Sequence, residues 1–223
     1  MATYNQLRDE VLRRCGALGE VEAQDVVQAA LVACMRFVSF HVRIPSLIGS
    51  ATATAPASPT LEANAIPLYT TGFTIPAGQF QVPDRLYVKK DSSTEGQGTP
   101  FDFREYHHFL DELNAPRSER VQIFAPGTLN ELPRFPYTIT PSNKLWALNI
   151  VEDNVLTLYY RKVPADYSPD SSPEITPLFD HILTSGAELA LKEFLKEPAA
   201  LTHLWQLFTD GLMPQIESYD SHI

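Results

Sequence analysis

The prolines of this chain are concentrated in its middle, and no other feature of the sequence constrains the fold as strongly. Sixteen of the 18 prolines lie between Pro45 and Pro177, none precedes Pro45, and only Pro198 and Pro214 follow. Proline interrupts helices and is excluded from central strands. We therefore expect helical ends and a middle made of short strands and many turns. The two ends are expected to pack together, because neither can cover its own apolar stripe.

Two helices are expected at the N-terminal end. The first begins at Thr3, which forms a capping box with Gln6, and ends near Gly16 or Gly19. The second runs from about Glu22 to His41 and is slim because it is rich in alanine. Helical spacing assigns four residues to its inner face: Val27, Leu31, Cys34 and Val38.

Two further helices are expected at the C-terminal end. The first runs roughly from Leu178 to Leu195, and Glu197-Pro198 ends it and begins the second. Its inward residues are expected to be Phe179, Ile182, Leu183, Gly186, Ala187, Ala190 and Phe194. The second has a broad apolar stripe of Leu201, Leu204, Trp205, Phe208 and Leu212. The predicted fold class is α+β. Residues 1–44 and 177–223 form a helical domain of about four helices, and residues 45–176 form a β-rich insert that resembles a sandwich or barrel.

Three local predictions concern the insert. The low-complexity segment Ser50–Pro59 predicts a flexible Ala/Thr/Pro arm near residues 50–60, since it has nothing large to bury. A short helix is expected from Phe103 to Leu113, with a stripe of Phe103, Tyr106, Leu110 and Leu113. Residues 144–151 and 155–161 predict a hairpin around Glu152-Asp153-Asn154, with Asn154 in the left-handed region. In that hairpin one set of side chains (Trp146, Leu148 and Ile150) would match another across the ladder (Leu156, Leu158 and Tyr160).

Motifs of catalysis and cofactor binding are missing from the sequence. It contains no phosphate-binding Walker loop and no G-x-S-x-G nucleophile elbow. The six histidines form no H-x-x-x-H pair, and His107 and His108 are expected to point to two sides of a helix, which would prevent them from chelating one metal. Cys15 and Cys34 are expected to be small buried hydrophobic residues. We therefore expect no enzyme, with no catalytic residue, no cofactor and no bound metal.

Charge and hydropathy limit the partners. Lys and Arg number 17 against 27 Asp and Glu, a net charge of −10, which argues against gripping nucleic acid through its phosphates. No run approaches the ~18–20 apolar residues of a membrane span, so no membrane partner is expected. The aromatic residues of the middle, among them Trp146 and Tyr160, are more typical of a β-sheet core than of a carbohydrate platform.

The order of segments resembles one family, the head-to-tail adaptor (connector) proteins of tailed bacteriophages. Residues 2–14 are similar to the opening helix of many such adaptors. The resemblance is strongest in the last third, where strand residues 156–161 precede Val163-Pro164 and an acidic, proline-rich linker. The motifs that follow are Phe179-Asp180, Gly186-Ala187-Glu188-Leu189-Ala190, Phe194-Leu195, Glu197-Pro198, Trp205 and Phe208. The resemblance extends over nearly the whole chain, but residues 45–141 match the family only in outline.

This resemblance implies a structural virion protein. It would form a ring, commonly of twelve copies, that docks beneath the portal protein in the neck of the virion and leaves a channel for the genome. Before assembly the chain would lie in the host cytoplasm. The partners would be other copies of the chain, the portal protein, a tail or nozzle protein, and genomic DNA that passes without specific binding. The expected partner interface comprises Met213, Ile216, Tyr219 and Ile223.

Two alternatives remain open. Another neck or tail-completion protein of the same virion would have a similar sequence pattern. A β-sandwich module that binds glycan or peptide through its aromatic residues belongs to a different class.

Overall fold

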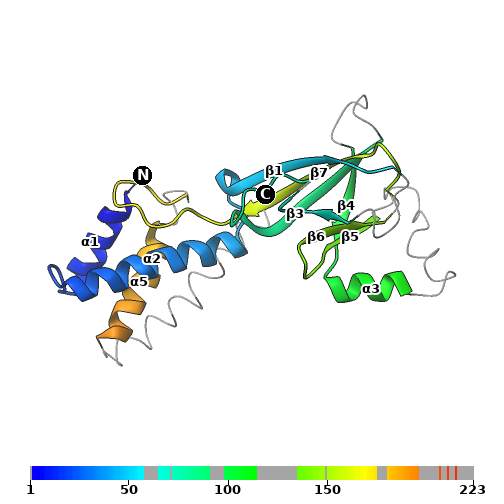
Figure 1. Ribbon diagram of the computed structural model, residues 1–223. Helices are drawn as coiled ribbons and strands as arrows, with labels where there is room; N and C mark the ends of the chain where they lie inside the picture. Colours follow the sequence, from blue (N-terminus) through cyan, green and yellow to red (C-terminus); the bar gives the residue numbers. More distant parts are fainter. Residues whose placement is uncertain are drawn as a thin grey trace. The chain divides into compact units, whose positions relative to one another are not determined.

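The computed structural model describes residues 2–57, 65–70, 72–90, 98–114, 135–148, 150–174 and 180–195, and the single residues 206, 210 and 214. The chain divides into two compact units (Figure 1). One comprises Met1–Ile48 and Arg161–Ile223 and contains the helices α1 (Tyr4–Arg14), α2 (Val21–His41) and α5 (Asp180–Phe194) and a short 3-10 helix, η1 (Pro45–Leu47). The other is Gly49–Tyr160 and contains most of a seven-stranded sheet. The chain is therefore α+β, as predicted.

The first helix of the helical unit, α1 (Tyr4–Arg14), has the caps that its sequence predicts. The Thr3 hydroxyl accepts a hydrogen bond from the Gln6 amide at 3.3 Å, and the Gln6 side chain accepts one from the Thr3 amide at 2.9 Å. Cys15 caps the other end, and Gly16 follows with φ +69°. A left-handed residue at this position ends a helix, and glycine adopts it without steric cost.

Helix α1 packs with α2 (Val21–His41) and α5 (Asp180–Phe194) around one apolar core. The largest fully buried side chains of this core are Leu7, Leu12, Leu31 and Met35, and α5 adds Ile182, Leu183, Ala187 and Leu191. The observed bounds of α2 and α5 lie within two residues of the predicted ones. The predicted residues Phe179, Leu201, Leu204, Trp205, Phe208 and Leu212 lie outside the described residues.

Of the inward assignments in these helices, that of Phe194 was wrong and that of Cys34 was correct only in part. Phe194 is 46% exposed, because the buried row of α5 runs through Leu183, Ala187 and Leu191 and leaves Phe194 beyond the edge of the core. On α2, Met35 is fully buried, whereas Cys34 is only partly buried and packs against the edge of the core. The long unbranched side chain of methionine fills irregular space in a core more readily than a thiol does.

By length and composition alone, α2 is also apolar enough to cross a membrane, with a mean hydropathy of 1.2 over its best window. A helix that packs between two others meets the same criterion. The contacts of α2 with α1 and α5 therefore account for the apolar character of its buried face.

The segment after the sheet belongs to the helical unit. The Tyr4 amide donates to the Ser171 carbonyl at 2.9 Å, and the Tyr167 hydroxyl donates to the side chain of Asn5 at 2.7 Å. The rings of Tyr4 and Tyr167 lie 5.2 Å apart. The units accordingly divide at residues 48/49 and 160/161, whereas the sequence suggested 44/45 and 176/177.

The sheet is mixed and barrel-like, in the order β1-β7-β3-β4-β5-β6-β2. Its strands are β1 (Ile48–Thr54), β2 (Ile66–Pro67), β3 (Phe80–Lys89), β4 (Thr99–Phe103), β5 (Phe135–Ile139), β6 (Lys144–Ala147) and β7 (Val155–Lys162). Strands β4 and β5 are parallel, whereas the pairs β3–β4, β5–β6 and β2–β6 are antiparallel. The second core of the chain lies within this unit and includes Tyr137, Phe73, Leu68, Leu86, Leu145, Leu156 and Leu158.

The predicted flexible arm was wrong for residues 50–55. Residues 50–54 belong to β1, in which Ala51 and Ala53 are buried while the intervening threonines are exposed. The amide of Ala55 donates to the carbonyl of Asn154 at 2.8 Å. The repeated Thr-Ala pair is therefore an alternating strand pattern with small inward residues. Residues 58–60 of the predicted arm lie outside the described residues.

The predicted hairpin was also wrong. Strand β6 pairs with β5 and β2, and β7 lies between β1 and β3. Leu145 and Ala147 are buried and Trp146 is not, so the inward face of β6 is opposite to the predicted one. The turn itself exists, since the Asn154 amide donates to the Val151 carbonyl, but the left-handed residue is Asp153 with φ +65°.

Helix α3 (Tyr106–Asn114) lies beside β5 and starts later than predicted. Phe103 belongs to β4, and the one fully buried residue of α3 is Phe109, which the predicted stripe omitted. The ring of Tyr106 meets that of Trp146 at 5.8 Å in an edge-to-face arrangement. The outward face of β6 is thus partly covered by this helix, which explains why its tryptophan points away from the barrel interior.

Candidate functional site

The predicted partner interface lies near the C-terminal end of the sequence. Met213, Ile216, Tyr219 and Ile223 all lie outside the described residues. Three surface features of the described residues are instead candidates for function: the outer face of α2, a pocket beside Trp146, and a cluster of two histidines and a glutamate at the start of α3.

The outer face of α2 has exposed apolar side chains beside one ion pair, in which Arg36 meets Asp166 at 2.6 Å. Ala29, Ala33 and Phe40 follow one another at nearly helical spacing and are exposed, Phe40 to 51%. Phe37 belongs to the same face, is 39% exposed, and contacts the ring of His41 at 4.5 Å. Arg161 donates to the carbonyl of Phe40 at 2.7 Å and so fixes the end of the helix. Contiguous exposed apolar side chains on a helix are typical of an interaction surface.

The neighbouring helices have a different surface. On α1, Arg8 pairs with Asp9 at 2.7 Å, and Arg14 pairs with Glu10 of its own helix and with Glu188 of α5 at 3.8 Å. These ion pairs are partly or fully exposed, and such pairs add little to stability. They mark a hydrated surface on α1.

A pocket of about 690 Å³ lies beside Trp146. Its lining includes Ala65, Tyr106, Thr140, Pro141, Ser142, Lys144 and Trp146. The turn between β5 and β6 shapes one wall, because the Thr140 hydroxyl accepts from the Lys144 amide at 3.1 Å and lies 3.0 Å from the Ser142 hydroxyl. Asn143 completes this turn with φ +56°. Aromatic rings, hydroxyl groups and one amine give the pocket the chemical means to hold a small polar ligand.

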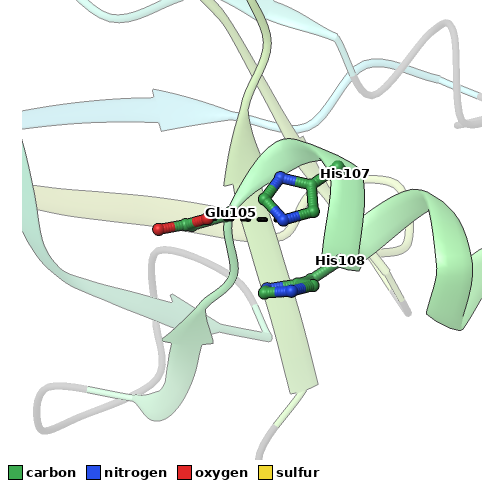
Figure 2. Close-up of side chains that lie close together, drawn as sticks. All are labelled: Glu105, His107 and His108. Carbon is green, nitrogen blue, oxygen red and sulfur yellow. Dashed lines mark ion pairs between the residues drawn. The ribbon is translucent and has the colours of Figure 1, made fainter.

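The cluster at the start of α3 consists of Glu105, His107 and His108, all exposed (Figure 2). The His107 Nε2 atom lies 3.5 Å from a carboxylate oxygen of Glu105, and the two imidazole rings are 4.0 Å apart. One potential ligand atom from each residue lies within 4.8 Å of the others. The expectation that the histidines point to two sides of a helix was therefore wrong. The two rings converge although their residues are adjacent in the helix.

Backbone contacts fix the segment that carries this cluster. The Arg104 amide donates to the Tyr137 carbonyl at 2.8 Å, and the Phe109 amide donates to the Glu105 carbonyl at 2.9 Å. The guanidinium of Arg104 pairs with Glu112 at 3.1 Å. The ring of Phe109 is fully buried and helps to hold the helix in place. The three side chains therefore project from a backbone whose position the fold defines.

Burial changes the acidity of several groups away from these features. It raises the pKa of the Cys34 thiol to about 11, and burial together with the charge of Glu174 raises the pKa of Tyr4 to about 12. Burial is also the main reason that the pKa of Tyr137 lies far above its ordinary value. Cys15 and Cys34 both pack against the helical core, but they are partly buried and not fully buried as predicted.

A scan against protein-family models and a search of curated proteins found no match to this chain. Sequence patterns did not predict the three surface features, because neither buried stripes nor known motifs mark them. The four-residue spacing of Ala29, Ala33 and Phe37 was the available signal for the outer face of α2. For the cluster the signal was the compact order Glu105-Tyr106-His107-His108.

Proposed function

We propose that this chain is a structural virion protein, a ring-forming head-to-tail adaptor that docks beneath the portal, connects it to the tail and leaves a channel for the genome. The resemblance of residues 2–14 and of the last third to the adaptor family is the first support. In this proposal both chain ends build one helical domain of about four helices, and the packing of α5 against α1 and α2 agrees with that arrangement.

The outer face of α2 is the observation that carries the proposal. A closed ring of identical subunits needs two different surfaces on each copy, since each copy contacts one neighbour on either side. The face of Ala29, Ala33 and Phe40 meets the requirement for one of them: two small residues allow close approach, and an exposed ring supplies area to bury. Burying one large apolar side chain stabilises by roughly 1.5–3 kcal/mol.

The acidic balance supports the same proposal. With a net charge of −10 per copy, a ring lumen is not expected to hold duplex DNA by releasing its counterions. DNA would then pass the channel without being retained. This is what a conduit requires.

The test is assembly of the full chain with the portal protein of the same virion. Negative-stain imaging and light scattering after size exclusion should show rings that contain both proteins. Phe40→Glu should raise the protein concentration needed for ring formation at least tenfold. Val21→Glu, at a 71% exposed position outside this face, is the matched control and should assemble normally.

Two results would contradict the proposal. One is a chain that stays monomeric at high concentration and does not migrate with the portal. The other is a Phe40→Glu variant that assembles as well as the unmodified chain while the circular dichroism of both is the same. A stable monomer that binds a glycan array would favour the binding module instead.

A further inference from the structure

The cluster at the start of α3 suits metal binding, which the adaptor proposal does not include. We propose that Glu105, His107 and His108 form a surface site for a divalent transition-metal ion of the zinc class. Figure 2 shows the carboxylate directed at the ring of His107, with the ring of His108 beside it. Two imidazoles and one carboxylate are a ligand set that Zn²⁺ accepts, with a fourth position left for water.

The distances agree with such a site. In a tetrahedral zinc complex with bonds near 2.0–2.1 Å, neighbouring ligand atoms are about 3.4 Å apart. The His107 Nε2 atom and the Glu105 carboxylate oxygen are 3.5 Å apart, which is already this spacing. No pair in the cluster exceeds 4.8 Å. Bringing the widest pair to the tetrahedral spacing takes at most a movement of about 1.4 Å, and exposed side chains achieve this by small rotations.

The surroundings leave the ligands available. Arg104, the nearest cation in the sequence, directs its guanidinium to Glu112, so Glu105 keeps its carboxylate for another partner. The backbone on both sides is held by the hydrogen bonds of Arg104 and Phe109. A rigid backbone reduces the ordering that metal binding would otherwise require.

The ligand types predict selectivity. Imidazole nitrogen suits Zn²⁺, Co²⁺, Ni²⁺ and Cu²⁺, whereas Mg²⁺ and Ca²⁺ prefer oxygen ligands only. Each imidazole supplies one of three protein ligands, so removing either one should weaken binding strongly. Loss of the carboxylate removes the single negative charge of the set.

Isothermal titration of the chelator-treated full chain with ZnCl₂ tests the site, and titration with MgCl₂ tests its selectivity. We expect Zn²⁺ to bind and Mg²⁺ to give no heat of binding. His107→Ala, His108→Ala and Glu105→Gln should each raise the dissociation constant for Zn²⁺ at least tenfold. His181→Ala removes an exposed histidine of α5 and is the matched control, with affinity unchanged.

Four outcomes would overturn the site: no Zn²⁺ binding by the unmodified chain, histidine variants that bind Zn²⁺ as tightly as the unmodified chain, a loss confined to one of the three substitutions, or an equal loss in His181→Ala. Glu105→Gln retains the size of the side chain and keeps the test valid if an alanine variant unfolds. Ring assembly is not measured here, so failure of this site leaves the adaptor proposal standing.

Discussion

Replacing Tyr137 by phenylalanine should stabilise the β-rich unit. Tyr137 is fully buried in β5, and its hydroxyl has no hydrogen-bond partner among the described residues. Burial, followed by the negative charges of Asp84 and Asp102, raises the pKa of this phenol far above its usual range, so the hydroxyl stays protonated. Folding therefore removes a polar O–H group from water and returns no hydrogen bond for it.

The magnitude follows from what the substitution removes and what it keeps. Leaving a buried polar group without a partner costs about 1–3 kcal/mol. Phenylalanine keeps the ring and with it the edge-to-face contact of Tyr137 with Phe103, whose centroids are 5.6 Å apart. The hydroxyl oxygen leaves a small void, and the packing lost around this void offsets part of the stabilisation. We expect the free energy of unfolding to rise by about 1 kcal/mol, which corresponds to roughly 4 °C in melting temperature for a unit of this size.

Urea unfolding followed by circular dichroism measures this change. The matched control is Tyr87→Phe on β3, where the hydroxyl is hydrogen-bonded to Arg85 near the surface. That substitution should leave stability unchanged or lower it slightly. If Tyr137→Phe instead lowers the unfolding free energy by 1 kcal/mol or more, the hydroxyl has a partner in solution and the reasoning fails.

Two further predictions concern close packing and burial. Gly49→Ala should destabilise the β-rich unit by about 1–3 kcal/mol, because a Cβ at Gly49 would lie 2.7 Å from the ring of the buried Tyr160; urea unfolding should show this, and Tyr160→Leu in the same chain should recover part of it. Burial raises the pKa of Cys34 to about 11, so its thiol should react with a thiol reagent at pH 8 roughly 100-fold more slowly than an unfolded cysteine. Rates measured on native and denatured protein give this ratio, and equal rates would contradict the prediction.

The helices were predictable because their signals are local. The capping box of Thr3 and Gln6 and the left-handed Gly16 are contained within a few residues, and each determines one end of α1 without reference to the rest of the chain. The bounds of α2 and α5 follow from periodicity in the same way. The error at Phe194 arose because periodicity gives a stripe, whereas the width of the core that the stripe meets depends on the other helices.

The strand pairing was not predictable to the same degree, because it depends on residues far apart in sequence. The turn at residues 151–154 looked like a hairpin turn, yet β6 pairs with β5 and β2. A shift of one residue reverses every inward side chain of a strand. Trp146 was assigned to the inward face because it alternates with Leu148 and Ile150 along the strand. In the structure Tyr106 of α3 meets its ring on the other face.

The candidate sites illustrate the same limit. An ideal helical wheel places His107 and His108 about 100° apart. In the structure their rings nevertheless lie 4.0 Å apart, and Glu105, which precedes α3, adds its carboxylate. Predicting the pocket beside Trp146 would have required the pairing of the strands on either side of the turn at Thr140. Neither could be found by motif, since the residues involved follow no established spacing.

The outer face of α2 is not explained by the folding of the described residues. The helical core closes through the opposite face of α2, with Val27, Leu31, Met35 and Val38 packed against α1 and α5. The β-rich unit has a separate core that contains no residue of α2. Exposed apolar side chains promote unwanted association. The face of Ala29, Ala33 and Phe40 therefore favours aggregation, although neither core needs these side chains in order to form. A subunit that buries this face against a neighbour removes this tendency, and the adaptor proposal supplies such a neighbour. The substitution of Phe40 therefore tests function without disturbing either core.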